Sequence, residues 1–428
     1  MIPVIGAGLA GSEAAWQLAE RGEQVELVEQ KPAHRSPAHT SDAFCELVCS
    51  NSLKSDDVRG NACGLLKEEM RRLGSLTMEA ADRTRVPAGG ALAVDRDKFS
   101  AYVTQKLRQH PNIHIVCREQ TSLPEAGIVA TGPLTEGALY AAIEARFGGG
   151  LHFYDATAPV VTAESVDYSA AFTADRYGRG MGDYVNCPLT KEEYEAFVTE
   201  LLAAEKVTLK DFEKREIFEG CMPVEVMASR GRDALRFGTF KPVGLADESG
   251  RRPYAVLQLR RENAEGSLLG LVGCQTNLKF GEQKRVFSLI PALKHAEFVR
   301  YGVMHRNTFL DAPHVLNADF SVKDAPMLFF AGQITGVEGY VESAMSGMLA
   351  GIHYWRKLHG KPPIVLSDAC VMGALSRYVA AENKHFQPMN ANYGILRGLD
   401  VRDKKEKKRL MAERALGEID LVRAALVK

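Results

Sequence analysis

The sequence predicts an α/β protein in which a Rossmann-like nucleotide-binding domain is interrupted by an inserted α+β domain. A glycine-rich turn follows an apolar strand at the N-terminus, and buried strands that end in glycine return near residues 130 and 331. Between these strands the pattern changes to a mixture of strands and helices. We therefore expect the nucleotide-binding domain at 1–150 and 301–398, an inserted substrate domain at 151–300 and a basic helical tail at 399–428.

The composition limits the class of protein. Of the 428 residues, 46% are hydrophobic, and 53 basic against 54 acidic residues leave a net charge of −1, so any nucleic-acid surface must be a local patch. No apolar run is long enough to span a membrane. Eight cysteines without a CxxC pair are typical of free thiols in a reducing cytoplasm. We therefore predict a cytoplasmic protein with no membrane segment, no disulfide framework and no metal.

The first elements read as strand, glycine turn, helix and strand. Gly6, Gly8 and Gly11 have the GxGxxG spacing, which permits a tight turn, close approach of a pyrophosphate and packing of a helix over 12–21 on the strand. The second strand, over 25–29, ends in Glu29, 18 residues after Gly11 and near the spacing of a ribose-binding acid. An ordinary glycine turn is the alternative. The candidate cofactor-binding residues here are Gly6, Ala7, Gly8, Leu9, Ala10, Gly11 and Glu29.

Further elements follow in order along the chain. A polar functional loop is expected over 31–61, a helix over 65–73, and short strands of the same sheet over 113–116 and 127–130. In the inserted domain, Thr190 and Glu193 form a capping-box pattern at the start of a helix, and 254–259 is strand-like. A buried strand over 327–331, a helix over 342–358 and a helix carrying the charge run 404–409 complete the prediction.

Two later turns favour FAD over NAD as the cofactor. The turn at Thr131 and Gly132 resembles the second FAD motif of two-dinucleotide-type flavoproteins, and Gly332 with Gln333 resembles the third. That class of flavoprotein usually has Asp at the position of Gln333. Tyr340 lies where the third segment turns into its helix, so it is a candidate to border the flavin. Gly347 and Gly351 leave one face of that helix bare for close approach of cofactor or sheet.

Blocks along the whole chain resemble the folate-dependent tRNA (uracil-5-)-methyltransferases, the TrmFO family, which is related to the GidA-like flavoproteins. The matching blocks are 6–15, 48–53, 85–95, 221–225, 275–279, 300–308 and 386–392. The glycine fingerprint is generic, whereas the other blocks are specific. The tail from about 399 is not part of the pattern that carries this resemblance.

The resemblance implies a specific reaction. Carbon 5 of a uridine in the T-loop of tRNA would receive the one-carbon unit of methylenetetrahydrofolate, and reduced FAD would supply the hydride that turns this unit into a methyl group. NAD(P)H would reduce the flavin again. The partners implied are therefore tRNA, folate and NAD(P)H.

Two cysteines match functional positions of the family. Pro223 is well placed as the first residue of a helix, which sets Cys221 before a helix N-terminus and favours its thiolate as the group that adds to uracil C6. Cys49 lies in the polar loop and is the candidate for a second catalytic role near the flavin, although the reverse assignment is open. His305 is a candidate for stacking on the pterin or lining the flavin pocket, and a core histidine is the alternative.

Several basic pairs are candidate tRNA contacts, and solvated surface is the alternative for each. They are Arg71 with Arg72, Arg251 with Arg252, Arg260 with Arg261, Lys284 with Arg285, and the lysines of 404–409. Three other functions stay open from the residues alone: an FAD oxidoreductase of a small molecule, a GidA-like modification of the wobble uridine, and an RNA-binding flavoprotein without catalysis.

Overall fold

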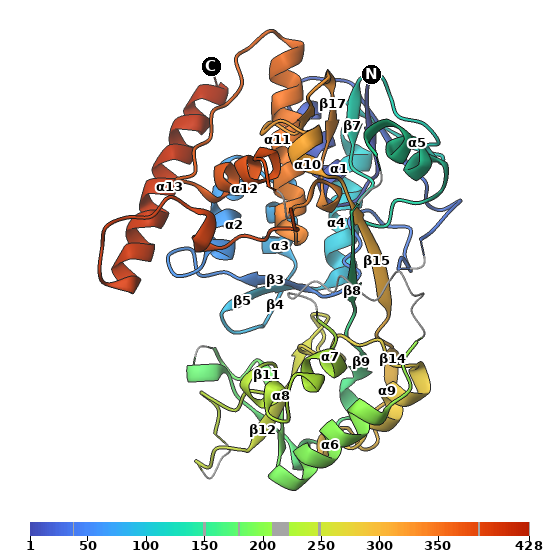
Figure 1. Ribbon diagram of the computed structural model, residues 1–428, viewed down its shortest axis with the longest axis vertical. Coiled ribbons are helices and arrows are strands. Elements are labelled where there is room, and N and C mark those ends of the chain that lie inside the picture. The colour runs from blue at the N-terminus through green and yellow to red at the C-terminus, as the bar shows by residue number, and fades with distance from the viewer. Residues whose placement is uncertain are drawn as a thin grey trace.

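Two bodies are joined by a pair of adjacent strands. The computed structural model describes residues 1–36, 38–148, 151–178, 180–207, 222–246, 250–383 and 386–427, without the side chains of 151–155, 304–306 and 427. Figure 1 shows a larger body above and an inserted body below, connected by β8 (Leu151–Ala156) and β15 (Met304–Phe309). These strands pair antiparallel along their whole length, so the chain enters and leaves the inserted body side by side.

The larger body is built on a six-stranded, mostly parallel sheet. Its strands are, in spatial order, β16 (Ser321–Val322), β17 (Ala325–Phe330), β7 (Gly127–Val129), β1 (Ile2–Ile5), β2 (Val25–Glu29) and β6 (Ile113–Cys117). All neighbours pair in parallel except β16 and β17. Val4, Leu27 and Ile128 are fully buried, as expected for strands covered on both faces. The predicted α/β class is confirmed.

Helices surround this sheet and a small three-stranded sheet. The helices are α1 (Leu9–Ala19), α2 (Ala62–Arg72), α3 (Leu76–Arg83), α4 (Arg96–Gln109), α5 (Gly137–Phe147), α10 (Ala312–Val315), α11 (Tyr340–Leu358), α12 (Val371–Ala380) and α13 (Lys404–Val427). The small sheet has the order β3 (Ser52–Ser55), β5 (Ala91–Val94), β4 (Arg85–Val86). The segment 31–61 is therefore not a loop throughout, because β3 lies near its end.

The bare face of α11 packs on α1. A Cβ at Gly347 would lie 2.0 Å from the backbone oxygen of Ala10, and one at Gly351 would lie 2.8 Å from that of Ala14. The expectation that this face approaches cofactor or sheet is wrong at these two positions, because the backbone of α1 occupies the space. This close packing fixes the orientation of α1 and α11 relative to each other.

The C-terminal helix α13 lies against α2 and belongs to the larger body's core. Met411, Ala412, Ala415 and Ile419 are buried in that core. The Arg72 guanidinium also lies 2.6 Å from the Asp420 carboxylate. The lysine-rich N-terminal end of α13 therefore belongs to a helix that packs on the larger body along its length.

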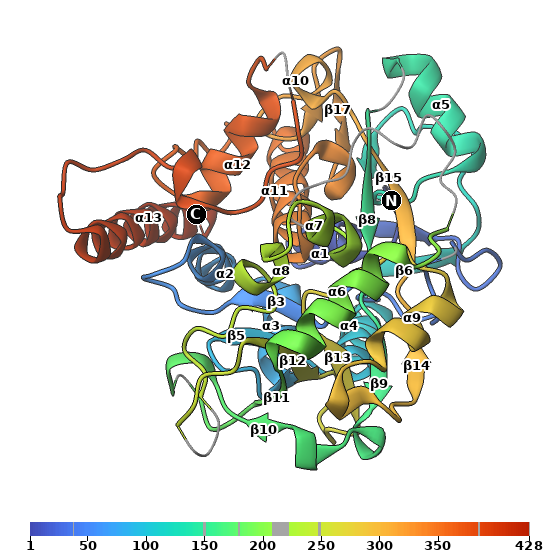
Figure 2. The same ribbon diagram turned by 60° about the horizontal axis from the view of Figure 1, so that its bottom comes forward.

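The inserted body has its own antiparallel sheet and core. Its strands are, in spatial order, β10 (Phe172–Thr173), β11 (Tyr184–Leu189), β12 (Ala255–Arg261), β13 (Leu268–Leu271), β9 (Val160–Thr162) and β14 (Phe298–Arg300). Its helices are α6 (Lys191–Ala203), α7 (Val224–Ser229), α8 (Ala234–Phe237) and α9 (Phe280–Phe287), and Figure 2 shows α6 and α9 over one face of the sheet. The predicted capping box is confirmed, because Thr190 and Glu193 exchange hydrogen bonds at the start of α6.

Short 3₁₀ turns complete the described structure. They are η1 (Ala163–Ser165), η2 (Tyr168–Ala170), η3 (Arg176–Gly178), η6 (Pro291–Leu293), η7 (Gln333–Thr335) and η8 (Tyr393–Ile395).

Candidate cofactor-binding and catalytic site

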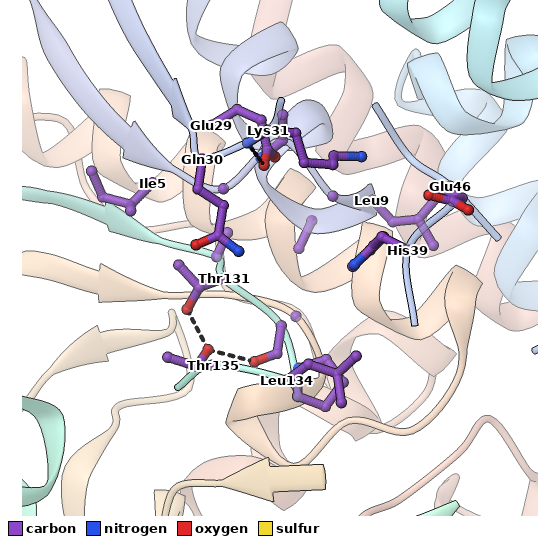
Figure 3. Close-up of a pocket in the computed structure, with 18 of the residues that line it drawn as sticks. Ile5, Leu9, Glu29, Gln30, Lys31, His39, Glu46, Thr131, Leu134 and Thr135 are labelled. Carbon is purple, nitrogen blue, oxygen red and sulfur yellow. Dashed lines mark hydrogen bonds between the residues drawn. The ribbon is translucent and has the colours of Figure 1, made fainter. Parts of the chain in front are cut away.

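A pocket opens at the carboxyl ends of β1, β2, β7 and β17, where ligands bind in open parallel sheets. Its lining includes residues from all three predicted cofactor motifs: Gly6, Ala7, Gly8, Leu9, Ala10, Glu29, Thr131, Gly132, Gly332, Gln333 and Tyr340. Figure 3 shows Glu29 and Lys31 on one side, Thr131 and Thr135 on the opposite side, and the Gln30 side chain between them. Segments more than 300 residues apart in the chain therefore meet around one space.

The glycine turn after β1 is built by close backbone contacts. Gly6 has φ +98°, and a Cβ there would lie 2.6 Å from the backbone oxygen of Ala130. A Cβ at Gly11 would lie only 1.8 Å from the backbone oxygen of Gly6, whereas one at Gly8 would meet no protein atom within 4 Å. Gly11 thus lets α1 pack on the turn, while the space beside Gly8 is open to a ligand. No side chain caps the first turn of α1, so its backbone N–H groups suit a phosphate.

Glu29 ties the end of β2 to the glycine turn. Its buried carboxylate accepts hydrogen bonds from the backbone N–H of Ala7 (2.9 Å) and of Lys31 (3.0 Å). A carboxylate offers about four acceptor positions, so these two bonds leave capacity for ribose hydroxyls. The Lys31 ammonium instead donates to the backbone oxygens of Ala43 (2.5 Å) and Ser41 (3.3 Å), which anchors the polar loop.

The Gln333 side chain, at the position where the resemblance to two-dinucleotide-type flavoproteins predicts aspartate, is bound to a buried carboxylate. The Gln333 side-chain amide donates a hydrogen bond to the carboxylate of Glu338, which is buried. An aspartate at 333 would bring a second negative charge toward that carboxylate, whereas an amide satisfies it. Next to it, the Gly332 N–H donates to the Ser346 hydroxyl (2.7 Å) of α11.

Tyr340 joins the third motif to Cys49. The Tyr340 hydroxyl accepts the backbone N–H groups of Cys49 (2.7 Å) and Ser50 (3.2 Å) and donates to Cys49 Sγ (2.9 Å). Burial raises the pKa of Tyr340 well above its ordinary value, so the hydroxyl keeps the proton that it donates. Tyr340 also lines the pocket, which places the half-buried Cys49 thiol next to the pocket wall.

The second predicted cysteine and the predicted histidine lie outside what the structure describes. Cys221 belongs to the undescribed stretch 208–221, and His305 lies in β15 with an undescribed side chain. Pro223 is the N-cap residue of α7, not its first helical residue as predicted, because its ψ of 141° is extended. Glu225 in the first turn of α7 accepts hydrogen bonds from the Thr276 hydroxyl (2.9 Å) and the Asn277 N–H (2.8 Å).

Sequence reasoning missed part of the pocket wall. Gln30, Lys31, His39, Glu46, Arg118 and Glu119 also line the pocket. The His39 Nδ1 lies 2.6 Å from the Ser36 hydroxyl, and burial together with the nearby Lys31 charge lowers the pKa of His39. No spacing pattern marks these residues, since they come from a polar loop and from the end of an edge strand.

Most of the predicted basic patches carry intramolecular partners. Arg71 pairs with Asp82 (2.7 Å), and Arg285 lies 2.8 Å from Glu282. Arg260 is nearly buried and binds Asn51 (2.9 Å). Arg251, Arg252, Lys404 and Lys405 are exposed.

The exposed pair Arg251 and Arg252 follows a stretch of chain that carries other exposed cations. It precedes Tyr254, whose ring lies 4.2 Å below the guanidinium of Arg236 and whose hydroxyl binds Asp233 (3.2 Å). Exposed Arg230, Arg232, Lys241 and Phe237 lie on the same or adjoining segments. This stretch of chain therefore combines exposed cations with an exposed aromatic ring.

The described part of the chain has neither a membrane-spanning helix nor a cluster of metal-binding side chains. No helix there is long and apolar enough to cross a membrane. Among the same residues, no group of three or more His, Cys, Asp or Glu side chains could hold a metal ion. The absence of a metal in this protein stays a prediction.

Comparison with protein families and curated proteins gives consistent matches. A model of the family described as glucose inhibited division protein A matches residues 1–362. The methylenetetrahydrofolate–tRNA-(uracil-5-)-methyltransferase TrmFO of Acetivibrio thermocellus is 57% identical over 422 residues, 97% of each chain. The protein of the same name from Pelotomaculum thermopropionicum is 55% identical over 100% of this chain and 99% of its own, so that match includes residues 399–428.

Solved structures share the fold. The form II crystal structure of Aquifex aeolicus GidA matches with a TM-score of 0.72 over 99% of this chain and 73% of that chain, at 17% identity. The form I crystal structure gives a TM-score of 0.71 over 98% of this chain and 75% of that one, at 16% identity. At these identities the likeness concerns the fold alone.

Proposed function

We propose that this chain, which belongs to the TrmFO family of methylenetetrahydrofolate–tRNA-(uracil-5-)-methyltransferases and to the wider GidA family, methylates carbon 5 of a uridine in tRNA. The observation that carries the proposal is 53–57% identity to curated members over nearly the whole chain. The pocket supports the proposal, because the pocket combines a site suited to a dinucleotide with a neighbouring cysteine. The carbon donor is methylenetetrahydrofolate, and the product in the T-loop is ribothymidine.

The chemistry requires a nucleophile and two electrons. Carbon 5 of uracil is a poor nucleophile until a group adds at carbon 6, and a thiolate is well suited to add there. The activated carbon 5 then attacks the methylene carbon, which is at the oxidation level of formaldehyde. When bound, reduced FAD would supply the hydride that completes the methyl group, and the folate would leave as tetrahydrofolate. NAD(P)H would then reduce the oxidised flavin again.

The residues of the pocket fit FAD. The backbone around Gly8 and the uncapped start of α1 would bind the pyrophosphate, since the space beside Gly8 is open. Glu29 would bind the ribose hydroxyls with its remaining acceptor positions. Thr131, Gly132, Gly332, Gln333 and Tyr340 would line the remainder of the cofactor, because they border the same pocket.

The two cysteines have different proposed roles. Cys221 adds to carbon 6 of uracil, and Cys49 has a second role beside the pocket, such as proton transfer or handling of the methylene carrier. The hydrogen bond between Tyr340 and Cys49 Sγ supports the position of Cys49. His305 stays a candidate for contact with the pterin or the flavin.

The position of the target uridine follows from the family alone. A T-loop uridine is buried in folded tRNA, so it would have to be extruded to reach the pocket. The test is to incubate the purified protein with unmodified tRNA, NAD(P)H and methylenetetrahydrofolate, and to map 5-methyluridine by nuclease digestion and mass spectrometry. A T-loop product is expected. Modification of the wobble uridine alone, or turnover without tRNA, would overturn the proposal.

Exposed cations of the inserted body are expected to bind the tRNA backbone. Replacing both Arg251 and Arg252 by Gln should weaken tRNA binding and lower the slope of log affinity against log salt by about 1 for each lost phosphate contact. Filter binding over a salt series measures this slope. Arg285→Gln is the control, because it removes one charge from α9 of the same body, where Arg285 forms ion pairs with Glu200 and Glu282. Equal slopes in all three proteins would contradict a contact at this surface.

A further inference from the structure

Arginine side chains form hydrogen bonds with the loop that carries Cys49, on both sides of this residue. Arg260 of β12 donates from Nε to the Asn51 Oδ1 and from Nη2 to the Ser50 hydroxyl, both at 2.9 Å. Arg96 at the start of α4 donates from Nη1 to the backbone oxygen of Leu47 at 2.5 Å. The segment 47–51 is thereby bound to both the larger and the inserted body.

These arginines belong to a cluster with excess positive charge. The Glu262 carboxylate lies 2.7 Å from Arg96 and 3.9 Å from both Arg260 and Arg300. We call Arg96, Arg260, Arg300 and Glu262 the arginine cluster. Three guanidinium groups therefore face one carboxylate, and the side chains of Arg96, Arg260 and Glu262 are only 14%, 11% and 7% exposed.

Part of this positive charge has no hydrogen-bond acceptor. Arg96 Nη2 and Arg300 Nε are buried and find no partner among the described residues. Cations in a site with little water interact more strongly with a nearby anion than they would in bulk solvent. The cluster therefore favours a negative charge close to the loop.

The Cys49 thiol lies within this segment and supplies a negative charge when it ionises. Arg96 and Arg260 bind Leu47, Ser50 and Asn51 on either side of Cys49, and the Tyr340 hydroxyl donates a hydrogen bond to Sγ. The Arg300 charge acts on the same thiol. Both a nearby cation and a donor favour the ionised form of an acid. Lys54, farther along the same chain segment, forms an ion pair with Glu342 at 3.6 Å, and this pair has no net charge.

We propose that the arginine cluster, together with the Tyr340 hydroxyl, holds Cys49 as a thiolate in the folded protein at neutral pH. Arg96, Arg260 and Arg300 are positioning residues, since they act on Cys49 and need not touch the substrate. The inference goes beyond the proposed function, because ionisation of the thiol requires neither tRNA nor folate.

The test is the rate at which iodoacetamide alkylates Cys49 in the purified holoenzyme as pH varies, read by mass spectrometry of the Cys49 peptide. A free cysteine thiol has a pKa of about 8.5. The midpoint of Cys49 alkylation against pH in the wild type should lie below this value. Arg300→Gln should raise the midpoint by about one pH unit. Glu262→Gln removes the one negative charge of the cluster and should shift the midpoint in the opposite direction.

Controls separate charge from damage to the fold. Arg300→Lys keeps the charge and should restore a midpoint near that of wild type. The exposed Cys117 reports on general accessibility in the same digest, and its midpoint should not change in any variant. A wild-type midpoint at or above that of a free thiol would overturn the inference. So would shifts of the same sign in Arg300→Gln and Glu262→Gln. Neither result would bear on methylation, which is measured separately.

Discussion

Alanine in place of Cys221 is expected to abolish tRNA methylation and the covalent adduct with RNA that carries 5-fluorouridine. Fluorine at carbon 5 cannot leave as a proton does, so it traps an enzyme after a thiolate has added at carbon 6. Loss of a nucleophile lowers turnover by about a thousandfold or more. Denaturing gel electrophoresis shows the adduct, and radiolabel transfer measures the methylation.

Alanine at Cys49, compared with alanine at Cys221, shows which role each of the two thiols has. Cys49→Ala should impair methylation while leaving the flavin content of the purified protein largely unchanged, because Cys49 lies beside the pocket wall and not on its lining. Cys117→Ala is the control, since this thiol is exposed at the end of β6, and it should behave as wild type. If Cys221→Ala still formed the adduct and Cys49→Ala did not, the two roles would be exchanged. Normal methylation by both variants would exclude catalysis by this pair.

Valine at Gly11 is expected to destabilise the protein and to remove its flavin. The new Cβ would lie 1.8 Å from the Gly6 backbone oxygen and 3.3 Å from the Ala130 Cβ, so α1 must move away from β1. Overpacking of this kind costs about 3 kcal/mol. Thermal melting and the visible flavin absorbance of the purified protein measure the two effects.

Gly8→Val distinguishes loss of the fold from loss of the site. A Cβ at Gly8 meets no protein atom within 4 Å, so the melting temperature of the apoprotein should stay near that of wild type while flavin is lost. Gly417→Ala on α13 is the control, because its Cβ also meets nothing within 4 Å and α13 does not line the pocket. A Gly8→Val protein that purified with full flavin content would exclude the pyrophosphate at this turn.

Local patterns predicted correctly the frame of the nucleotide-binding body and the start of α6 in the inserted body. The glycine turn between β1 and α1, the end of β2 at Glu29 and the capping box at Thr190 depend on neighbouring residues. Each of these features is set by backbone geometry or by a contact within one turn, so the sequence shows it directly. The strands expected over 113–116 and 127–130 do belong to the same sheet as the first two.

Contacts over long sequence distances could not be predicted in the same way. Tyr340 and Cys49 are 291 residues apart, and Arg260 and Asn51 are 209 residues apart. The sequence contains each residue but not the pairing, because the pairing depends on how the inserted body returns to the larger one. Gly347 illustrates the same limit, since its spacing predicted a close approach but not that α1 makes it. The roles of Cys221 and His305 stay predictions.

In the proposed reaction the methyl group comes from folate and is completed by a separate reductant. The direct test uses methylenetetrahydrofolate with both methylene hydrogens replaced by deuterium, together with NAD(P)H, FAD-loaded protein and unmodified tRNA. The expected product is 5-methyluridine whose methyl group carries two deuterium atoms and one hydrogen, with tetrahydrofolate as the folate product. A methyl group without deuterium would contradict folate as the carbon donor. Formation of dihydrofolate would contradict hydride delivery by the flavin.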